Sequence, residues 1–255
     1  MANVGQQSAK TELLNTTNTG SPIVVPLPPE SRELTAGEIS LAKLMFKDSI
    51  PYKKVRIVRG ELLGMPDHSE NAMTPFGEIH LPSKKYDEIK DFYNGSIEQK
   101  RWFIHEMAHV WQYFAMDICV ACRGVDIAMK GGYSQKHPSG RLMAYAYDLL
   151  GVDARKEFKD FNIEQQADIV CHYYLAVYHK NYLVNQTQFP TLLAQQTRRE
   201  YILRRFLKNP MDKNLKSIEW DWGRNDQNKS ILGRAVNQKF YRRGTKFYSF
   251  QSSLK

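Results

Sequence analysis

Residues 102–112 of this chain read WFIHEMAHVWQ and contain the pattern His-Glu-x-x-His from His105 to His109. Two residues four apart project from one face of a helix, about a turn apart, so both imidazoles could grip one zinc ion. Glu106 beside them is placed to act as general base. The flanking residues are nearly all apolar, which predicts a buried helix. Histidines satisfied within a core are the alternative interpretation, so the metal hypothesis needs a third ligand.

Residues 161–170, FNIEQQADIV, supply a candidate for that ligand. Glu164 and Asp168 are four apart and share one face of a second predicted helix. Glu164 would complete a His-His-Glu zinc site with one open position. Asp168 could accept the second ring N–H of a ligating histidine and fix its tautomer. The plainer interpretation is that both are acidic residues in a first helical turn, where the helix dipole favours them.

Two further groups are candidates for catalysis and substrate binding. A hydroxyl can donate to an oxyanion that develops during hydrolysis, and Tyr145 and Tyr147 could serve, although alternating aromatic residues also pack in cores. An edge strand could bind a substrate peptide through main-chain hydrogen bonds. Our candidate for that strand is 76–81, with substrate contacts from Phe76, Gly77, Glu78 and Ile79.

The two motifs together resemble the gluzincin branch of zinc metallopeptidases. The fuller text, FIHEMAHVWQ followed by FNIEQQADIV, is similar to metallopeptidases associated with bacterial type VI secretion spike proteins, over about residues 34–178. The resemblance implies His105, His109 and Glu164 as zinc ligands and Glu106 as the acid/base. It also implies a toxin-like effector with a spike or carrier protein and an immunity protein as partners.

Composition and charge restrict the class of protein. Hydrophobic residues make up 42% and charged residues 25%, as in an ordinary folded domain, and no apolar run approaches the length of a membrane span. We expect secretion without a signal peptide into a target periplasm, or otherwise a cytoplasmic location. The net charge is +9, and residues 198–255 hold fifteen Lys or Arg against five Asp or Glu, while the first 197 hold 21 against 22. This asymmetry suits an anionic partner or a merely solvated basic face.

Cys119 and Cys122 form a Cys-x-x-Cys pair just after the histidine motif. A second metal site would need a matching pair of ligands, and a redox motif would need a thioredoxin-like context. A local disulfide or two buried thiols is the simpler interpretation, and an oxidising compartment would favour the disulfide.

We expect an α-rich α+β, zincin-like fold with a small antiparallel sheet. The predicted divisions are a flexible arm (1–33), a catalytic domain (34–190) and a basic, aromatic-rich extension packed on that domain (191–255). Predicted helices are at about 36–47, 86–93, 96–118, 162–180 and 191–208, predicted strands are at 55–63 and 71–81, and an irregular segment runs from 122 to 141.

The favoured function is zinc-dependent amide-bond hydrolysis by a secreted antibacterial effector that acts on peptidoglycan stem peptides. Three alternatives remain open. They are a toxin that cleaves proteins, a catalytically idle zincin-fold adaptor of an injection apparatus, and a nucleic-acid binder that uses the basic tail.

Overall fold

The computed structural model describes residues 30–60, 71–184 and 190–218. The expected arm (1–33), except for its last four residues, and most of the basic extension lie outside them. The helices are α1 (Ala36–Phe46), α2 (Ser83–Glu88), α3 (Ile97–Phe114), α4 (Val120–Met129), α5 (Ile163–Tyr178), α6 (Lys180–Val184), α7 (Pro190–Ala194) and α8 (Gln196–Lys208). The strands are β1 (Ser31–Glu33), β2 (Arg56–Arg59) and β3 (Ile79–Leu81), and short 3-10 turns lie at Tyr52–Lys54, Phe158–Asp160 and Lys213–Leu215.

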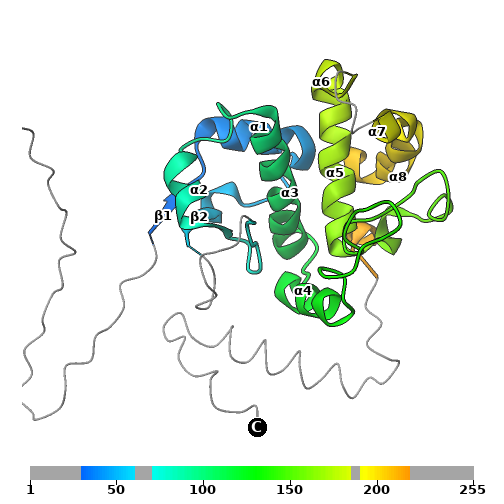
Figure 1. The fold of residues 1–255 in the computed structure, drawn as a ribbon. Coiled ribbons are helices and arrows are strands. Elements are labelled where there is room, and N and C mark those ends of the chain that lie inside the picture. The colour runs from blue at the N-terminus through cyan, green and yellow to red at the C-terminus, as the bar shows by residue number, and fades with distance from the viewer. Residues whose placement is uncertain (1–29, 61–70, 185–189, 219–255) are drawn as a thin grey trace, which may run out of the picture.

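Helices α3 and α5 lie side by side in the middle of the molecule and form its most extensive helix contact (Figure 1). Both begin at a reciprocal cap. Ser96 accepts from the backbone of Gln99 while the Gln99 side chain accepts from Ser96, and Asn162 and Gln165 repeat this arrangement. Such caps satisfy backbone N–H groups that a helix start leaves without partners. They fix where each helix begins and therefore which side chains face the other helix.

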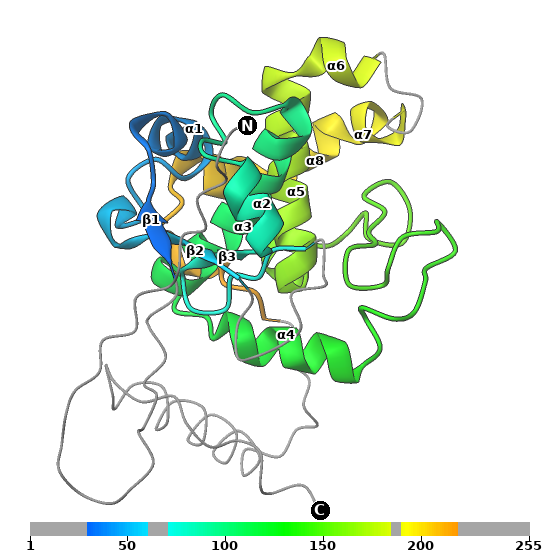
Figure 2. The same ribbon diagram turned by 60° about the vertical axis from the view of Figure 1, so that its left-hand side comes forward.

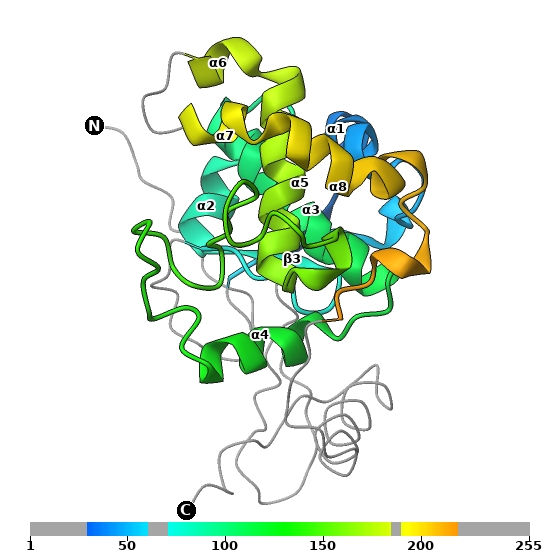
Figure 3. The same ribbon diagram turned by 90° about the vertical axis from the view of Figure 1, so that its right-hand side faces the viewer.

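The core is built around α3 and is closed on one side by α8, which crosses α5 (Figure 3). Trp111 is fully buried, stands edge-on to Phe206 of α8 at 5.2 Å, and donates from Nε1 to the Pro210 carbonyl at 2.7 Å. Phe46 of α1 meets the same Phe206 ring at 5.9 Å. Burial of such a ring stabilises the folded state by about 1.5–3 kcal/mol relative to an exposed ring. These contacts hold α1, α3 and α8 in one core.

The sheet differs from the expected antiparallel one. Its order is β1-β2-β3, with β1 antiparallel and β3 parallel to β2, so it is mixed. The expected strand 71–81 is shorter, because only Ile79–Leu81 pairs with β2 and Met73 forms an isolated bridge to His80. Gly77 between them has a φ of 81°, which breaks the extended path. The α+β class is confirmed, with helices predominating.

The prediction of an irregular segment at 122–141 is wrong for the first part of that range. Helix α4 occupies Val120–Met129 and lies beneath the ends of α3 and α5 (Figure 2). Gly124 lies within this helix, and because glycine has a low helix propensity, the sequence did not indicate a helix here. The rest of the segment is irregular, as expected, and continues through a loop at 131–147.

The helix expected at 191–208 is divided at Gln195 into α7 and α8, and it ends at the C-cap Asn209 as expected. Its inner face, Arg199, Ile202, Leu203 and Phe206, is buried against the core. The division at residue 190 stays a prediction, and the described part beyond it shares the core of the preceding residues. Among the described residues, no helix is both long and apolar enough to cross a membrane.

Candidate metal centre

Three buried side chains from α3 and α5 converge on one point. His105 and His109 project from the same face of α3, and Glu164 lies in the first turn of α5 opposite them. The Glu164 Oε2 atom is 3.3 Å from Nε2 of His105 and 3.2 Å from Nε2 of His109. One ligand atom from each residue lies within 4.8 Å of the others, so the three could hold a metal ion.

Hydrogen bonds on the far side of each ring leave Nε2 available. Nδ1 of His105 lies 3.1 Å from Oδ1 of Asp168, a carboxylate that accepts the ring proton. Nδ1 of His109 lies 2.8 Å from Oε1 of Gln112. The Gln112 amide nitrogen donates to the Ile163 carbonyl at 3.0 Å, so its oxygen faces the ring and accepts. Fixing the tautomer in this way is typical of ligating histidines.

Charge in the cluster favours a cation between the rings and the carboxylate. Burial alone would lower the pKa of His105, but Asp168, Cys171 and Glu164 raise it well above its ordinary value. Burial alone would raise the pKa of Glu164, but His109 and His105 hold it far below its ordinary value. The carboxylate is therefore ionised, and positive charge at the two Nε2 atoms is stabilised. Two imidazoles and one carboxylate fit zinc, with room for a further ligand.

Glu106 is buried beside the cluster, and Thr74 contacts it. The Thr74 hydroxyl donates to Oε2 of Glu106 at 2.7 Å. Thr74 and Glu106 are 4% and 6% exposed, so this bond lies away from bulk water. No local sequence pattern points to Thr74, which lies 32 residues before Glu106 and outside both motifs.

The loop at 131–147 contacts the α5 residues directly, which sequence analysis missed. The Tyr133 hydroxyl donates to Oε1 of Glu164 at 2.6 Å, on the oxygen that does not face the histidines. The guanidinium of Arg141 pairs with Oδ2 of Asp168, while Oδ1 of the same carboxylate faces His105. Each acidic residue is thus held on one oxygen by the loop and on the other by α3.

Tyr147 makes the third contact from this loop. Its hydroxyl lies 2.5 Å from Nδ1 of His172. Burial lowers the pKa of His172 to about 3, against the opposing effect of Asp168, so the ring is neutral and accepts from the tyrosine. Glu164, Asp168 and His172 are four residues apart, so the loop is bonded along three successive turns of one face of α5.

The two tyrosines proposed to stabilise the oxyanion, Tyr145 and Tyr147, therefore differ in what their side chains contact. The Tyr147 hydroxyl is engaged by His172, which directs it to α5. The Tyr145 ring lies 6.0 Å from the His105 ring and is half-buried, beside the metal cluster. Burial raises the pKa of the Tyr145 hydroxyl, so it keeps its proton and can donate.

The expected substrate-binding strand is only partly present. Ile79 lies in β3 and is fully buried, whereas Phe76, Gly77 and Glu78 precede the strand. The backbone of His80 exchanges both hydrogen bonds with Met73, at 3.0 and 2.9 Å, which covers the outer edge of β3 at that point. A substrate role for these residues stays a prediction.

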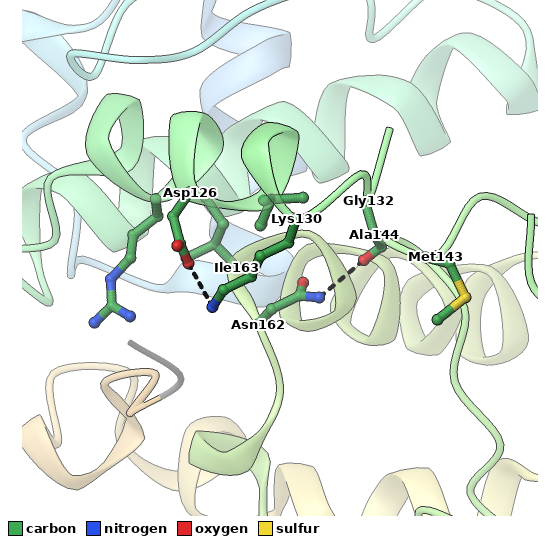
Figure 4. Close-up of a pocket in the computed structure, with 9 residues that line it drawn as sticks. Asp126, Lys130, Gly132, Met143, Ala144, Asn162 and Ile163 are labelled. Atoms are coloured by element: carbon green, nitrogen blue, oxygen red, sulfur yellow. Dashed lines mark hydrogen bonds and ion pairs between the residues drawn. The ribbon is translucent and has the colours of Figure 1, made fainter. Parts of the chain in front are cut away.

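A pocket of about 160 Å³ lies between α4 and the start of α5 (Figure 4). Asp126 and Lys130 form an ion pair of 3.0 Å on its α4 side, and Asn162 donates to the Ala144 carbonyl at 3.1 Å across it. Lining residues Gly132, Ala144 and Ile163 each directly precede a residue of the site, namely Tyr133, Tyr145 and Glu164. None of the proposed metal ligands lines the pocket itself.

Cys119 and Cys122 form a disulfide at the start of α4, which confirms the local bond. The Cys119 sulfur also accepts from the backbone of Cys122 as the helix cap. The remaining cysteine, Cys171, is buried on α5 with its sulfur 3.8 Å from Oδ1 of Asp168.

Comparison with known proteins gives two matches and no match to a family model. The chain is 38% identical over 144 residues to the type VI secretion system spike protein VgrG2b of Pseudomonas aeruginosa, which covers 56% of this chain and 13% of that protein. It is similar in structure to the effector domain of Pseudomonas aeruginosa VgrG2b, with a TM-score of 0.52 and 29% identity over 68% of this chain and 82% of the other. The chain thus resembles that effector domain in sequence and fold, and spans a small part of the whole spike protein.

Proposed function

We propose that this protein is a zinc-dependent amide-bond hydrolase that acts as a type VI secretion effector. The observation that carries the proposal is the convergence of His105, His109 and Glu164, with both Nε2 atoms turned toward one carboxylate oxygen. Glu106 lies on the same helix as the two histidines, within the buried part of α3. A buried triad of this chemistry beside an additional carboxylate has the parts that hydrolysis needs.

In the proposed mechanism, His105, His109 and Glu164 hold the zinc ion, and Asp168 and Gln112 fix the ring tautomers. Zinc bound by these residues would supply Lewis acidity toward a scissile carbonyl and a water molecule. Glu106 accepts a proton from the attacking water and then delivers it to the leaving amine.

Tyr145 is the better oxyanion candidate of the two tyrosines. It stands beside His105, and its hydroxyl retains a proton to donate. A donor aimed at developing negative charge stabilises the transition state more than the ground state. We propose that Tyr147, bonded to His172, acts through the position of the loop instead.

The proposed substrate is the stem peptide of peptidoglycan in the periplasm of a target bacterium. Similarity to an effector domain supports delivery into another cell. A net charge of +9 suits an anionic cell wall. The Cys119–Cys122 disulfide suits an oxidising compartment. The proposed partners are a secretion spike or carrier protein for delivery and an immunity protein in the producing cell.

Digestion of purified sacculi tests this proposal. The zinc-loaded protein and its Glu106→Gln variant are incubated with sacculi, and soluble fragments are identified by mass spectrometry. Glu88→Gln, an exposed change on α2, is the matched control. We expect stem-peptide fragments from the parent and from the control, and none from Glu106→Gln.

A protein substrate is the alternative outcome of the same experiment. If zinc is bound and sacculi stay intact, the three preparations are next incubated with a periplasmic protein extract. Cleavage that requires Glu106 would keep the hydrolase and replace its substrate. Absence of cleavage in both experiments would reject the hydrolase in favour of an adaptor.

A further inference from the structure

Glu106 is held by a residue that belongs to neither motif. Thr74 donates its hydroxyl proton to Oε2 of Glu106 at 2.7 Å, and both residues are buried. A hydrogen bond to a carboxylate in such surroundings is stronger than a neutral one. It fixes the rotation of a carboxylate that otherwise could turn about its last side-chain bond.

The backbone around Thr74 is itself fixed on both sides. Met73 exchanges two backbone hydrogen bonds with His80, at 3.0 and 2.9 Å. Pro75 follows Thr74 and disfavours the helical region for it. These constraints leave the Thr74 hydroxyl little freedom to follow a moving carboxylate.

Gly77 ties the same segment to the far end of α3. Its φ is 81°, and a Cβ atom there would lie 2.6 Å from the Phe114 ring and 2.7 Å from the Tyr113 ring. Only glycine allows this approach in this conformation. Residues 73–77 are therefore anchored to β3 and to α3, the helix that carries Glu106.

We propose that Thr74 is the positioning residue of Glu106. Its hydroxyl occupies Oε2 and turns Oε1 toward the attacking water. This inference rests on the proposed hydrolase function. It assigns a task to residues 73–77, of which sequence analysis places only Phe76 and Gly77 in a candidate substrate-binding strand.

The first test compares Thr74→Val, which keeps the side-chain shape but removes the donor, with Thr74→Ser, which keeps the donor. The kcat and KM values are measured on the substrate that the cleavage experiments identify, either a stem peptide or a protein. Zinc content is measured on each sample. We expect Thr74→Val to lose roughly tenfold to a hundredfold in kcat, with KM and zinc content unchanged. Thr74→Ser should recover most of kcat. If Thr74→Val does not fold, Thr74→Ala replaces it.

A second test does not depend on activity. A double-mutant cycle of Thr74→Val and Glu106→Ala is measured by denaturant unfolding of the metal-free protein. We expect the two changes to be coupled by roughly tenfold or more in the unfolding equilibrium constant, because each removes the same bond. If the two changes instead had additive effects on the free energy of unfolding, the proposed hydrogen bond between Thr74 and Glu106 would be overturned.

The outcomes separate this inference from the proposed function. If the parent cleaves nothing while the cycle shows coupling, the hydrolase is rejected and the Thr74–Glu106 bond stands without a catalytic task. If the parent is active and Thr74→Val matches it, or loses zinc together with kcat, or is not rescued by Thr74→Ser, the positioning role is overturned.

Discussion

Helix α3 and the loop at 131–147 act on the same face of α5 in different ways. Helix α3 presents His105 and His109 from one rigid element, and their spacing alone sets their separation. The loop reaches α5 through three side chains of two kinds, namely two tyrosines and an arginine. The proposed metal binding and proton transfer thus involve the helix, whereas the loop, apart from the proposed oxyanion donor Tyr145, holds the α5 residues in place. If this contrast is correct, changes on the α3 side should abolish function and changes on the loop side should weaken it.

Removal of a proposed metal ligand should have the largest effect. Glu164→Ala and His109→Ala should each lower zinc affinity by at least roughly a hundredfold, more than the loss of an outer partner does. Zinc at a hundredfold excess over Kd should raise the stability of the parent by about 2.7 kcal/mol, and these variants should lose that gain. Thermal unfolding with zinc or with EDTA measures both.

Glu157→Ala, an exposed change near α8, is the control for this experiment. It should respond to zinc as the parent does. An unchanged zinc response in Glu164→Ala would show that Glu164 is not a ligand.

Glu106→Gln should separate chemistry from metal binding. The amide cannot accept the proton, so activity should fall by roughly 10²- to 10⁴-fold. Zinc content and melting temperature should remain those of the parent, because the three ligands are intact. Metal analysis beside the sacculus assay measures this, and loss of zinc in Glu106→Gln would assign a binding role to Glu106.

Asp168→Asn should cause an intermediate loss. The amide keeps the size of the side chain but gives up the charge that faces His105 and Arg141. We expect zinc affinity or activity to fall roughly 10- to 100-fold. Zinc titration checks this, with the exposed Asp87→Asn as control. A loss as large as that of Glu164→Ala would place Asp168 among the ligands.

Tyr133→Phe should have the smallest effect and report on the loop. It removes one hydroxyl bonded to Glu164, at a cost of about 1 kcal/mol in unfolding free energy. Amide hydrogen exchange should accelerate in residues 131–147 and stay unchanged in α3. The control is Tyr201→Phe on the exposed face of α8. Equal acceleration in α3 would mean that the loop and the helix open together.

The difference between helix and loop also explains what sequence analysis could predict. His105, His109, Glu164 and Asp168 were recognised because local spacing sets the helix face, and the structure brings all four together. Helix starts at Ser96 and Asn162 follow from capping chemistry within four residues.

Contacts across the chain were not predictable in this way. Thr74, Tyr133 and Arg141 reach the site by tertiary packing, and no fixed spacing relates a loop residue to its partner on a helix. The prediction of a wholly antiparallel sheet is wrong for β3, which runs parallel to β2. Strand direction depends on the connection between strands, which the periodicity of the sequence does not reveal. Gln112 could have been found, since it lies three residues after His109 on the same helix.

The bridge between Met73 and His80 has a consequence for association between molecules. A strand at the edge of a sheet offers unpaired backbone groups to any neighbouring chain. Here Met73 occupies those of His80, and the opposite edge strand, β1, is only three residues long with charged Arg32 and Glu33. The described sheet therefore offers no long template for edge-to-edge aggregation.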